Sequence, residues 1–375
     1  MKKLLTGILA SIMSLTLLTG CSTTDQPEEN SSTEEGQTTE QTKDETTEEK
    51  LTAGVFYYNF ADVYISTVRT NVDKMLDEAG IEYQNYDGAG IQATQVDQIN
   101  TAVANGVDLL IVNAVEVEAM DIVNIAKEAD LPIIFFNREV EDDVISSYEK
   151  AAYIGTSSTE AGHLQGQMIG DHLTANYDAV DLNGDGEISY VMFKGQEGNV
   201  EAEGRTKYGV EDANTKLTEA GKPELVFYDA NNTSKYLVDQ GGNWSAQAAT
   251  DYMNVILAEY SENNGNMIEL IIANNDGMAE GAISSLQSVG YNTGEGEAKT
   301  IPVFGVDATD SAKQLIAESK MTGTIMQDAK GMAEAIVNLA SNIKNGEDIM
   351  ANTDSYAVDE SVDKIRVPYS IYSGE

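Results

Sequence analysis

The chain of 375 residues is strongly acidic: 63 Asp and Glu face 22 Lys and Arg, which gives a formal net charge of −41. Such a charge excludes nucleic acid and anionic membrane surfaces as natural partners, because both would repel the protein. With only 2 His and 1 Cys, the sequence offers no Cys/His metal cluster and no Ser/His/Asp or Cys/His catalytic set.

Residues 1–21 have the features of an export signal. Lys2 and Lys3 form a positive start, and residues 4–18 form an apolar stretch that is too short and too often interrupted by Ser and Thr to span a membrane. The segment ends in Leu-Thr-Gly-Cys at 18–21, which resembles the lipobox of bacterial lipoproteins. This resemblance implies cleavage before Cys21 and a thioether-linked lipid on its sulfur. An ordinary secretory signal with a chance cysteine is the alternative.

Residues 22–50 are dominated by Thr, Ser, Glu, Gln and Asp, with no aromatic and no aliphatic residue. Such a segment cannot bury enough apolar surface to offset its ordering entropy, so it predicts a disordered tether. An acidic linker repels itself and extends. Together with Cys21, the tether predicts a protein that is lipid-anchored to the outer face of the cytoplasmic membrane.

Residues 51–375 alternate apolar, β-rich runs with amphipathic segments, which predicts an α/β protein with parallel sheets covered on both faces. Their length exceeds that of one small core and fits two lobes. We expect strands at 53–58, 109–113, 133–136, 188–193, 269–273 and 303–306. We expect helices at 64–79, 94–105, 117–129, 158–174 and 332–345.

A calcium-binding loop is predicted at 181–189, which reads D-L-N-G-D-G-E-I-S. Side-chain oxygens recur at Asp181, Asn183 and Asp185, a glycine follows at the sixth place, Glu187 would offer its backbone carbonyl, and Ser189 could supply a ninth-place oxygen. The twelfth place of an EF-hand loop needs a bidentate Glu but holds a methionine here, so one carboxylate must come from elsewhere. A surface turn without metal is the alternative.

Polar residues follow each predicted strand, and ligands of parallel α/β sheets bind beyond the carboxyl ends of strands. Amide and carboxylate groups in this number suit the vicinal hydroxyls of a sugar, and two aromatic residues, Tyr64 and Trp244, could stack on a pyranose ring. Singly, Asp62, Asp276 and Asp307 could each be a helix N-cap. The strand-end residues are Asn59, Asp62, Tyr64, Asn113, Asn137, Arg138, Glu139, Asn199, Glu201, Arg205, Asn274, Asn275, Asp276, Asp307, Gln327 and Asp328.

At these residues the chain resembles the galactose/glucose-binding proteins of bacterial ABC transport and chemotaxis. The motifs that carry the resemblance are D-L-N-G-D-G-E-I-S, V-D-Q-I-N (96–100), F-F-N-R-E (135–139), I-A-N-N-D (272–276), V-F-G-V-D (303–307) and R-V-P-Y (366–369). The resemblance implies the type I periplasmic binding protein fold, in which two Rossmann-like lobes with parallel sheets are joined by a three-strand hinge and close on one sugar. It also implies that Ser189 ligates Ca²⁺ and that Glu269 supplies the missing carboxylate.

Carried over residue by residue, the resemblance assigns ring stacking to Tyr64, usually Phe in the family, and to Trp244, where the match slips by one residue. The family's hydroxyl-binding residues are matched without change at Asp62, Asn113, Arg205, Asn275 and Asp307. Three positions depart from the pattern, because the family's His, the Asp after it and an Asn are here Asn199, Glu201 and Gln327. We expect Glu201 to hold Arg205 in place. A sugar ligand is retained, whereas its identity as glucose or galactose is open.

The resemblance divides the chain into an N-terminal lobe of 51–131 and 328–366 and a C-terminal lobe of 132–327 and 367–375. It implies a monomer that delivers a neutral monosaccharide to the permease of an ABC importer, with one structural Ca²⁺ and no catalysis. A sensing lipoprotein that partners a chemoreceptor or a sensor kinase has the same fold, and so has a binding protein for a different aldose. The sequence does not separate these alternatives.

Three other functions have weaker support. Residues 88–93 match the dinucleotide-binding pattern G-x-G-x-x-A, but exported chains rarely meet NAD and a tight turn explains the glycines. Glu201 and Glu203 could in principle form the carboxylate pair of a glycosidase. A sugar-responsive repressor is disfavoured by the export signal and by the lack of a basic helical N-terminal domain.

Overall fold

The computed structural model describes residues 50–294, 299–359 and 361–374, which form one compact unit. The predicted signal segment, Cys21 and all of the tether except Lys50 lie outside the described residues. No helix in the described ranges is long and apolar enough to cross a membrane.

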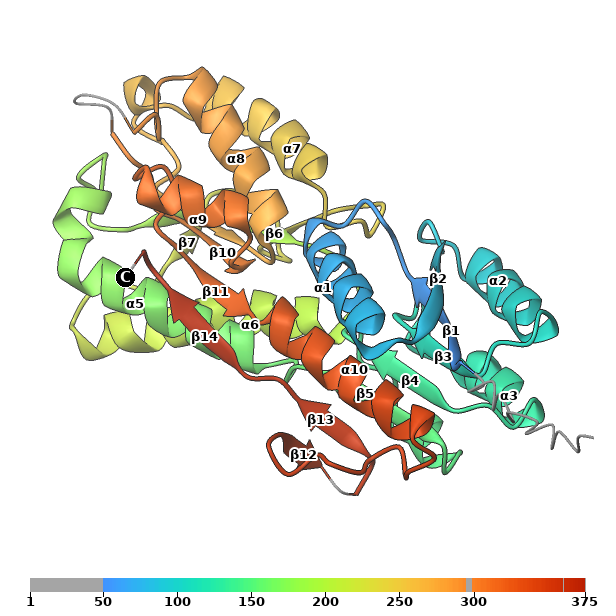
Figure 1. Cartoon of the computed structure of the whole chain (residues 1–375). Helices are drawn as coiled ribbons and strands as arrows, with labels where there is room; N and C mark the ends of the chain where they lie inside the picture. Colours follow the sequence, from blue (N-terminus) through green and yellow to red (C-terminus); the bar gives the residue numbers. More distant parts are fainter. Residues whose placement is uncertain (1–49, 295–298, 360, 375) are drawn as a thin grey trace, which may run out of the picture. The chain divides into compact units, whose positions relative to one another are not determined.

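The first sheet has seven strands in the order β12-β13-β5-β4-β3-β1-β2 (Figure 1). Its strands are β1 (Thr52–Tyr57), β2 (Glu82–Asp87), β3 (Leu109–Val112), β4 (Ile133–Phe136), β5 (Ala151–Gly155), β12 (Ala357–Asp359) and β13 (Lys364–Arg366). All neighbours are parallel except β12 and β13. The helices of this lobe are α1 (Val63–Ala79), α2 (Gln92–Ala104), α3 (Met120–Glu128), α4 (Asp142–Ser146) and α10 (Ala329–Lys344).

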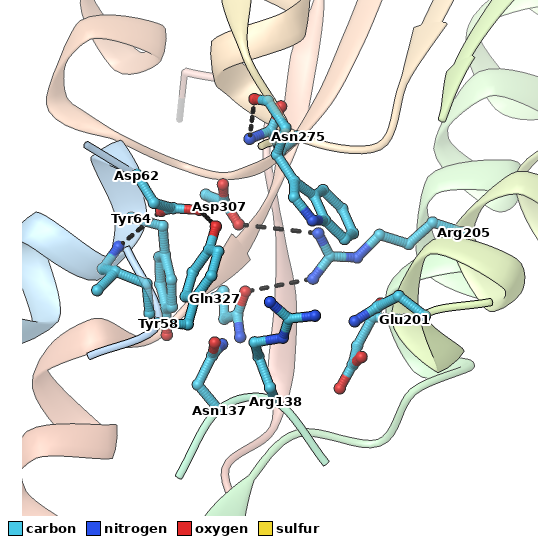
Figure 2. A pocket seen from close by; sticks show the side chains of 13 residues that line it. Tyr58, Asp62, Tyr64, Asn137, Arg138, Glu201, Arg205, Asn275, Asp307 and Gln327 are labelled. Carbon is cyan, nitrogen blue, oxygen red and sulfur yellow. Dashed lines mark hydrogen bonds and ion pairs between the residues drawn. The ribbon is translucent and has the colours of Figure 1, made fainter. Parts of the chain in front are cut away.

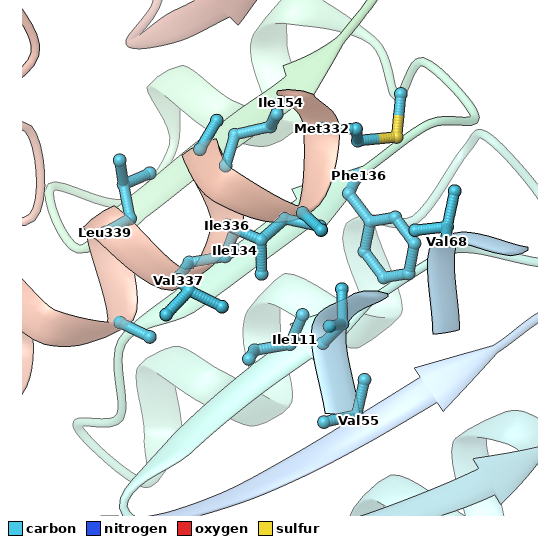
Figure 3. Close-up of a cluster of buried hydrophobic side chains, with 14 of the residues drawn as sticks. Val55, Val68, Ile111, Ile134, Phe136, Ile154, Met332, Ile336, Val337 and Leu339 are labelled. Carbon is cyan, nitrogen blue, oxygen red and sulfur yellow. The ribbon is translucent and has the colours of Figure 1, made fainter. Parts of the chain in front are cut away.

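Both faces of the first sheet are buried, as continuous apolar strands require. Along β1, Val55 and Tyr57 face the core formed with α1 and α10, whereas Phe56 faces the core formed with α2, α3 and α4. Figure 3 shows the first of these cores, in which Phe136 of β4 and Ile336 of α10 are buried together. The two cores fix the carboxyl ends of β1, β3 and β4 at one edge of the sheet.

The second sheet has the order β14-β11-β10-β9-β6-β7, with β8 also paired to β6. Its strands are β6 (Ser189–Lys194), β7 (Val226–Phe227), β8 (Leu237–Val238), β9 (Leu270–Ala273), β10 (Val303–Asp307), β11 (Gly323–Gln327) and the antiparallel β14 (Tyr369–Tyr372). Helices α5 (Glu160–Val180) and α6 (Val200–Glu219) cover one face. The other face is covered by α7 (Ala246–Glu259), α8 (Asp276–Ser288) and α9 (Asp310–Ala317), and a short 3-10 helix, η1 (Glu262–Asn264), follows α7.

The predicted fold class of two α/β lobes with mostly parallel sheets is confirmed, but the predicted lobe boundary after residue 131 is wrong. β4 pairs with β3, and β5 pairs with β4, so both belong to the first sheet. Within the described residues the chain passes between the sheets after β5, after β11 and between β13 and β14. A short apolar run such as I-I-F-F fits either sheet equally well, so only its pairing partner, Ile133 beside Leu110, decides where it belongs.

Candidate functional site

A cavity lies where the strand ends of the two sheets face each other. Figure 2 shows side chains from both lobes pointing into it. The lining residues are Tyr58, Asp62, Tyr64, Ile65, Asn137, Arg138, Asn199, Glu201, Arg205, Trp244, Asn275, Asp307 and Gln327. Nine of the ten predicted sugar-binding residues are therefore brought together, and Asn113 is not.

Asp62 and Tyr64 enter the cavity from the start of α1. One oxygen of Asp62 caps the helix by accepting from the Ile65 backbone N–H at 2.9 Å, and the other accepts from the Tyr58 hydroxyl at 2.5 Å. Burial raises the pKa of Asp62, although the bond from Tyr58 opposes the rise. The Asp62 carboxylate is thus fixed in orientation at the cavity wall, and the N-cap interpretation of this residue also holds.

Arg205 is buried on α6 and is held by groups from three strand ends. Its guanidinium donates to the Asn274 carbonyl at 2.8 Å, to the Tyr369 hydroxyl at 2.8 Å and to Gln327 Oε1 at 3.3 Å. Asp307 Oδ1 lies 4.0 Å from Nη1 (Figure 2). Burial alone would lower the pKa of Arg205, but Tyr369 and Asp307 outweigh it and raise the pKa. The guanidinium is therefore a fixed, charged donor.

The expectation that Glu201 holds Arg205 is wrong. The Glu201 carboxylate points away from the guanidinium, and neither of its oxygens has a hydrogen-bond partner among the described residues (Figure 2). The arginine instead donates to the Asn274 carbonyl and the Tyr369 hydroxyl at the strand ends, while Glu201 interacts with it only through charge. Glu201 is 6% exposed, and burial raises its pKa. A buried carboxyl group without a partner is free to accept from a ligand.

Asn113 lies behind the cavity wall rather than in it. Its amide nitrogen donates to the Phe136 carbonyl at 3.1 Å and to Asn137 Oδ1 at 3.2 Å, so it supports the neighbouring strand end. Four residues that the sequence did not assign to ligand binding also line the cavity, namely Tyr58, Ile65, Asn137 and Arg138. Asn137 and Arg138 follow a predicted apolar strand, and this polar strand end is the signal in the sequence that identifies them.

Arg138 links the two lobes at the edge of the cavity. Its Nη2 donates to Gln196 Oε1 at 2.6 Å, and its guanidinium lies 4.6 Å from the centre of the Tyr58 ring. Burial lowers the pKa of Arg138, with the acidic groups around it opposing the change. Its Nε has no partner among the described residues, so one donor remains for a ligand.

Trp244 is placed by an unusual backbone conformation. Its φ is +56°, which is rare for a bulky residue, and its ring lies against the backbone of Gly195. The Trp244 carbonyl accepts from the Asn275 side-chain nitrogen at 3.1 Å, and Asn275 Oδ1 in turn caps α8 by accepting from the Met278 N–H at 2.9 Å. Asn275, not Asp276, is therefore the N-cap of this helix. The Arg205 guanidinium is 5.5 Å from the ring, so the aromatic and the charged donor are neighbours.

The remaining lining residues lie at helix starts and strand ends of the second lobe. Asn199 caps α6 by accepting from the Ala202 N–H at 3.0 Å. Asp307 ends β10, and burial raises its pKa well above the usual value while Arg205 opposes the rise. Asp307 is not an N-cap, because Thr309 caps α9. The cavity is thus lined by both acceptors and donors, which suits a ligand whose groups both donate and accept.

Comparison with known proteins identifies the family. Residues 53–348 match the model of the periplasmic binding protein domain. The chain belongs to this family of periplasmic binding proteins. It is 35% identical over 318 residues to the D-galactose/methyl-galactoside-binding periplasmic protein of Haemophilus influenzae, covering 84% of this chain and 87% of that protein. It is 28% identical to a putative rhizopine-binding protein of Rhizobium meliloti, covering 79% and 85%.

Solved periplasmic binding proteins share the fold. A solute-binding protein of a Bacillus halodurans ABC transporter, solved with myo-inositol, has a TM-score of 0.63 and 25% identity, with 87% of this chain and 95% of that chain covered. One from Clostridium phytofermentans, solved with β-D-glucose, has a TM-score of 0.66 and 19% identity, with 86% and 94% covered. These relatives are binding proteins rather than enzymes, so the prediction of a binding protein without catalysis is confirmed.

The residues of the enzymatic alternatives are not arranged for catalysis. Glu203 does not line the cavity with Glu201, because its carboxylate accepts from Lys194 Nζ at 2.6 Å and from the Gly198 N–H at 3.0 Å. The glycine pattern at 88–93 forms a turn after β2, in which the Gly90 N–H donates to the Tyr58 carbonyl at 2.7 Å. This turn supports Tyr58, which lines the cavity. Helix α2 begins only at Gln92, after both glycines.

The loop at 181–189 of this binding protein is joined to Glu269 by hydrogen bonds. Glu269 Oε1 accepts from the Leu182 N–H at 2.7 Å, and Oε2 accepts from the Ser189 N–H at 2.9 Å. Within the loop, the two oxygens of Asp181 accept from the N–H groups of Gly184 and Gly186 at 2.6 and 2.9 Å. The glutamate therefore contacts both ends of the loop.

The predicted ligands of this loop are oxygen atoms of mixed kinds, which is the chemistry that a hard cation prefers. No group of three Asp, Glu, His or Cys side chains in the described ranges is arranged as a metal cluster. The predicted ligands also include an amide, a hydroxyl and a backbone carbonyl, which is the mixture that Ca²⁺ accepts. Burial raises the pKa of Glu269, although the hydrogen bonds from Ser189, Leu182 and Asn183 oppose the rise.

Proposed function

We propose that the protein binds one neutral monosaccharide in the cavity between its two lobes and delivers it to an ABC importer outside the cytoplasm. The observation that carries the proposal is a set of buried polar atoms without partners at one cavity. Both oxygens of Glu201 and the Nε atoms of Arg138 and Arg205 have no hydrogen-bond partner among the described residues. Unpaired buried groups destabilise a protein by about 1–3 kcal/mol each, so a binding protein retains them where a ligand completes them.

A sugar satisfies this set better than other small molecules do. Each hydroxyl both donates and accepts, so it can bond to a carboxylate such as Asp307 and to a guanidinium such as Arg205. The aromatic rings of Tyr64 and Trp244 suit the C–H faces of a pyranose. The relatives support the proposal, because their names or bound ligands include galactose, glucose and myo-inositol.

Galactose and glucose are the leading candidates among neutral aldoses. The Haemophilus relative at 35% identity supports them, whereas Asn199, Glu201 and Gln327 depart from the pattern of the resembling family. Titration calorimetry with galactose, glucose, ribose, xylose and arabinose tests the proposal, and Asp307→Ala serves as the site-disrupted control. We expect heat and a thermal shift with at least one sugar. No heat and no shift with any neutral sugar would refute the proposal.

We also propose that one Ca²⁺ binds the loop through Asp181, Asn183, Asp185, the Glu187 carbonyl, Ser189 and Glu269. The ion would hold the loop that precedes β6 and would act on stability rather than on sugar chemistry. A ligand that binds only the folded state stabilises it by about 2.7 kcal/mol at a hundredfold excess over Kd.

The calcium proposal is tested by melting the protein with and without EDTA, after metal analysis has shown that the starting sample contains Ca²⁺. We expect EDTA to lower the Tm of the wild type and to have no effect on Glu269→Gln. Glu187→Gln is the matched control, because its ligand is the backbone carbonyl, and it should respond to EDTA like the wild type. An unchanged wild-type melt would contradict the proposal.

The lipid anchor at Cys21 is a proposal of the sequence alone, since the residue lies outside the described ranges. The motif Leu-Thr-Gly-Cys and the acidic segment after it support it. Expressed in a Gram-positive-type host, Cys21→Ser should appear in the medium, whereas the wild type should sediment with membranes. Membrane retention of the variant would point to a different anchor.

A further inference from the structure

Asp307 presents its carboxylate to the cavity from a strained turn. Its φ is +122°, and that of the next residue, Ala308, is +54°. Two successive non-glycine residues with positive φ are uncommon, and such conformations persist only where the surrounding structure enforces them. Something next to the turn must therefore hold it.

The carboxylate of Asp276 is linked to both backbone N–H groups that follow Asp307, directly to one and through the Thr324 hydroxyl to the other. The Thr309 N–H donates to Asp276 Oδ2 at 2.8 Å. The Ala308 N–H reaches the same carboxylate through a relay: it donates to the Thr324 hydroxyl at 3.4 Å, and that hydroxyl donates to Asp276 Oδ1 at 2.6 Å. One carboxylate thus fixes two consecutive peptide groups of the strained turn.

Asp276 does not contact the cavity, so direct binding of a ligand does not explain why a carboxylate is buried at this position. It lies in the first turn of α8, is 0% exposed and does not line the cavity. Among the described residues no Lys, Arg or His forms an ion pair with it. Its Oδ1 approaches β10 so closely that a Cβ on Gly305 would lie 2.3 Å away. The carboxylate is therefore packed directly behind the strand end that carries Asp307.

We propose that Asp276 is a positioning residue for the ligand: it holds the Asp307–Ala308 turn and thereby orients the Asp307 carboxylate toward the bound sugar. The inference rests on the proposed sugar-binding function and goes beyond it, because Asp276 itself touches no ligand. It assigns Thr324 a role as the relay between the carboxylate and the Ala308 N–H.

The ionised form of Asp276 is needed for this role, because each hydrogen bond of the relay is donated toward its carboxylate, from the Ala308 N–H to the Thr324 hydroxyl and from that hydroxyl to Asp276. An ionised Asp276 accepts from the Thr324 hydroxyl, whereas a protonated one donates a proton of its own and competes with it. Burial raises the pKa of Asp276 to about 7. The charged groups that face it are Glu280 on α8 and Asp307 on β10, and Arg205 lies beyond Asp307.

The sign of the pH effect follows from these groups. A carboxyl group with a raised pKa is charged above that pKa and neutral below it, so the relay is intact above about pH 7. The affinity for the sugar should therefore fall as the pH drops through 7. In Asp276→Asn that step should disappear, while any step from Asp307 itself remains.

Titration calorimetry at pH 5.5 to 8.5, with the aldose that binds the wild type, tests the inference. We expect Asp276→Asn to weaken binding by about tenfold at pH 8, as for loss of one or two buried hydrogen bonds, and to flatten the profile near pH 7. Thr324→Val, which keeps the shape but removes the hydroxyl, should also weaken binding, and Thr324→Ser should restore it. Ser285→Ala, a buried polar deletion elsewhere on α8, is the control and should bind like the wild type.

A second measurement does not need a ligand. In Asp276→Asn, amide hydrogen exchange at Ala308 and Thr309 should become faster in the free protein, while exchange elsewhere on α8 stays unchanged. Unchanged exchange at these two amides, or wild-type affinity with a wild-type pH profile, would overturn the inference. Failure of the wild type to bind any neutral sugar would refute the proposed function instead, so the two failures are distinguishable.

Discussion

Gly195→Ala should displace the Trp244 ring and weaken sugar binding without unfolding the protein. A Cβ on Gly195 would lie 2.1 Å from the ring atoms Cδ2 and Cε3, whereas ordinary contacts begin at 3.4 Å. The ring must therefore move by about 1.3 Å or the strand end must give way. Gly195 directly follows β6, whose Phe193 is fully buried, so the ring on its exposed loop is the part that moves.

The expected loss of sugar affinity follows from the contact that the Trp244 ring makes with the sugar. An aromatic contact stabilises by about 0.5–1.5 kcal/mol beyond the area that it buries, and a displaced ring also intrudes on the volume that the sugar occupies. We expect the Kd to rise at least tenfold, which corresponds to about 1.4 kcal/mol. Stability should change by less than about 1 kcal/mol, because the ring is half-exposed and its backbone is already strained.

Titration calorimetry and denaturant unfolding on the same samples separate the two effects. Gly277→Ala is the matched control: its Cβ would lie 3.5 Å from the Trp244 carbonyl oxygen, an ordinary contact, and alanine favours the first turn of α8. The control should bind like the wild type. Wild-type affinity of a folded Gly195→Ala protein would show that the Trp244 ring does not contact the sugar from this position.

Two further predictions concern the groups behind the cavity and at the lobe junction. Asn113→Ala should lower the free energy of unfolding by about 1–3 kcal/mol, because it leaves the Phe136 carbonyl without this donor, and should affect sugar affinity less than Asp307→Ala does. Lys364→Met should destabilise by about 3–5 kcal/mol, because Lys364 is 1% exposed and is 2.9 Å from the Glu139 carboxylate. Burial would raise the pKa of Glu139, but Arg366 and Lys364 lower it below 4.5, so the difference from wild type should shrink as the pH falls below about 4.5. Denaturant titrations at pH 7 and pH 4 measure the changes in stability, and titration calorimetry measures the affinity of Asn113→Ala. Lys330→Met, from an exposed ion pair, should change stability little.

The alternation of buried strands and amphipathic helices was readable because each strand is buried on both faces. A run such as L-L-I-V at 109–112 has no polar face, and parallel sheets with helical crossovers are what such runs predict. β2 was missed for the opposite reason: its sequence E-Y-Q-N-Y-D is an edge strand with half-exposed polar side chains, and periodicity does not separate it from a loop. The fold class can thus be predicted from the apolar composition of the buried strands, whereas an edge strand is recognised only from its pairing with a neighbouring strand.

The sequence predicts which kinds of side chain form the site, but it does not predict which of them reach the cavity and which lie behind its wall. Asn113 and Asn137 both follow apolar strands that are neighbours in the sheet, so the same rule selects both. Only the structure shows that Asn113 turns back to bond the Phe136 carbonyl and that Asn137 reaches the cavity. The two side chains are in direct contact, with 3.2 Å between Asn113 Nδ2 and Asn137 Oδ1, and no local pattern encodes which of them reaches the cavity.

Backbone strain accounts for what the sequence could not reveal about Trp244 and Asp307. Both have positive φ, a conformation that their residue types do not favour, so propensity predicts the wrong local geometry at the two places where the ligand is expected. Each strained residue is held by a side chain from the start of α8, Trp244 through Asn275 and the Asp307 turn through Asp276. Because these two holders are adjacent in sequence, a single helix start sets both an aromatic wall and a carboxylate of the cavity. A shift of α8 would therefore move two sides of the site together.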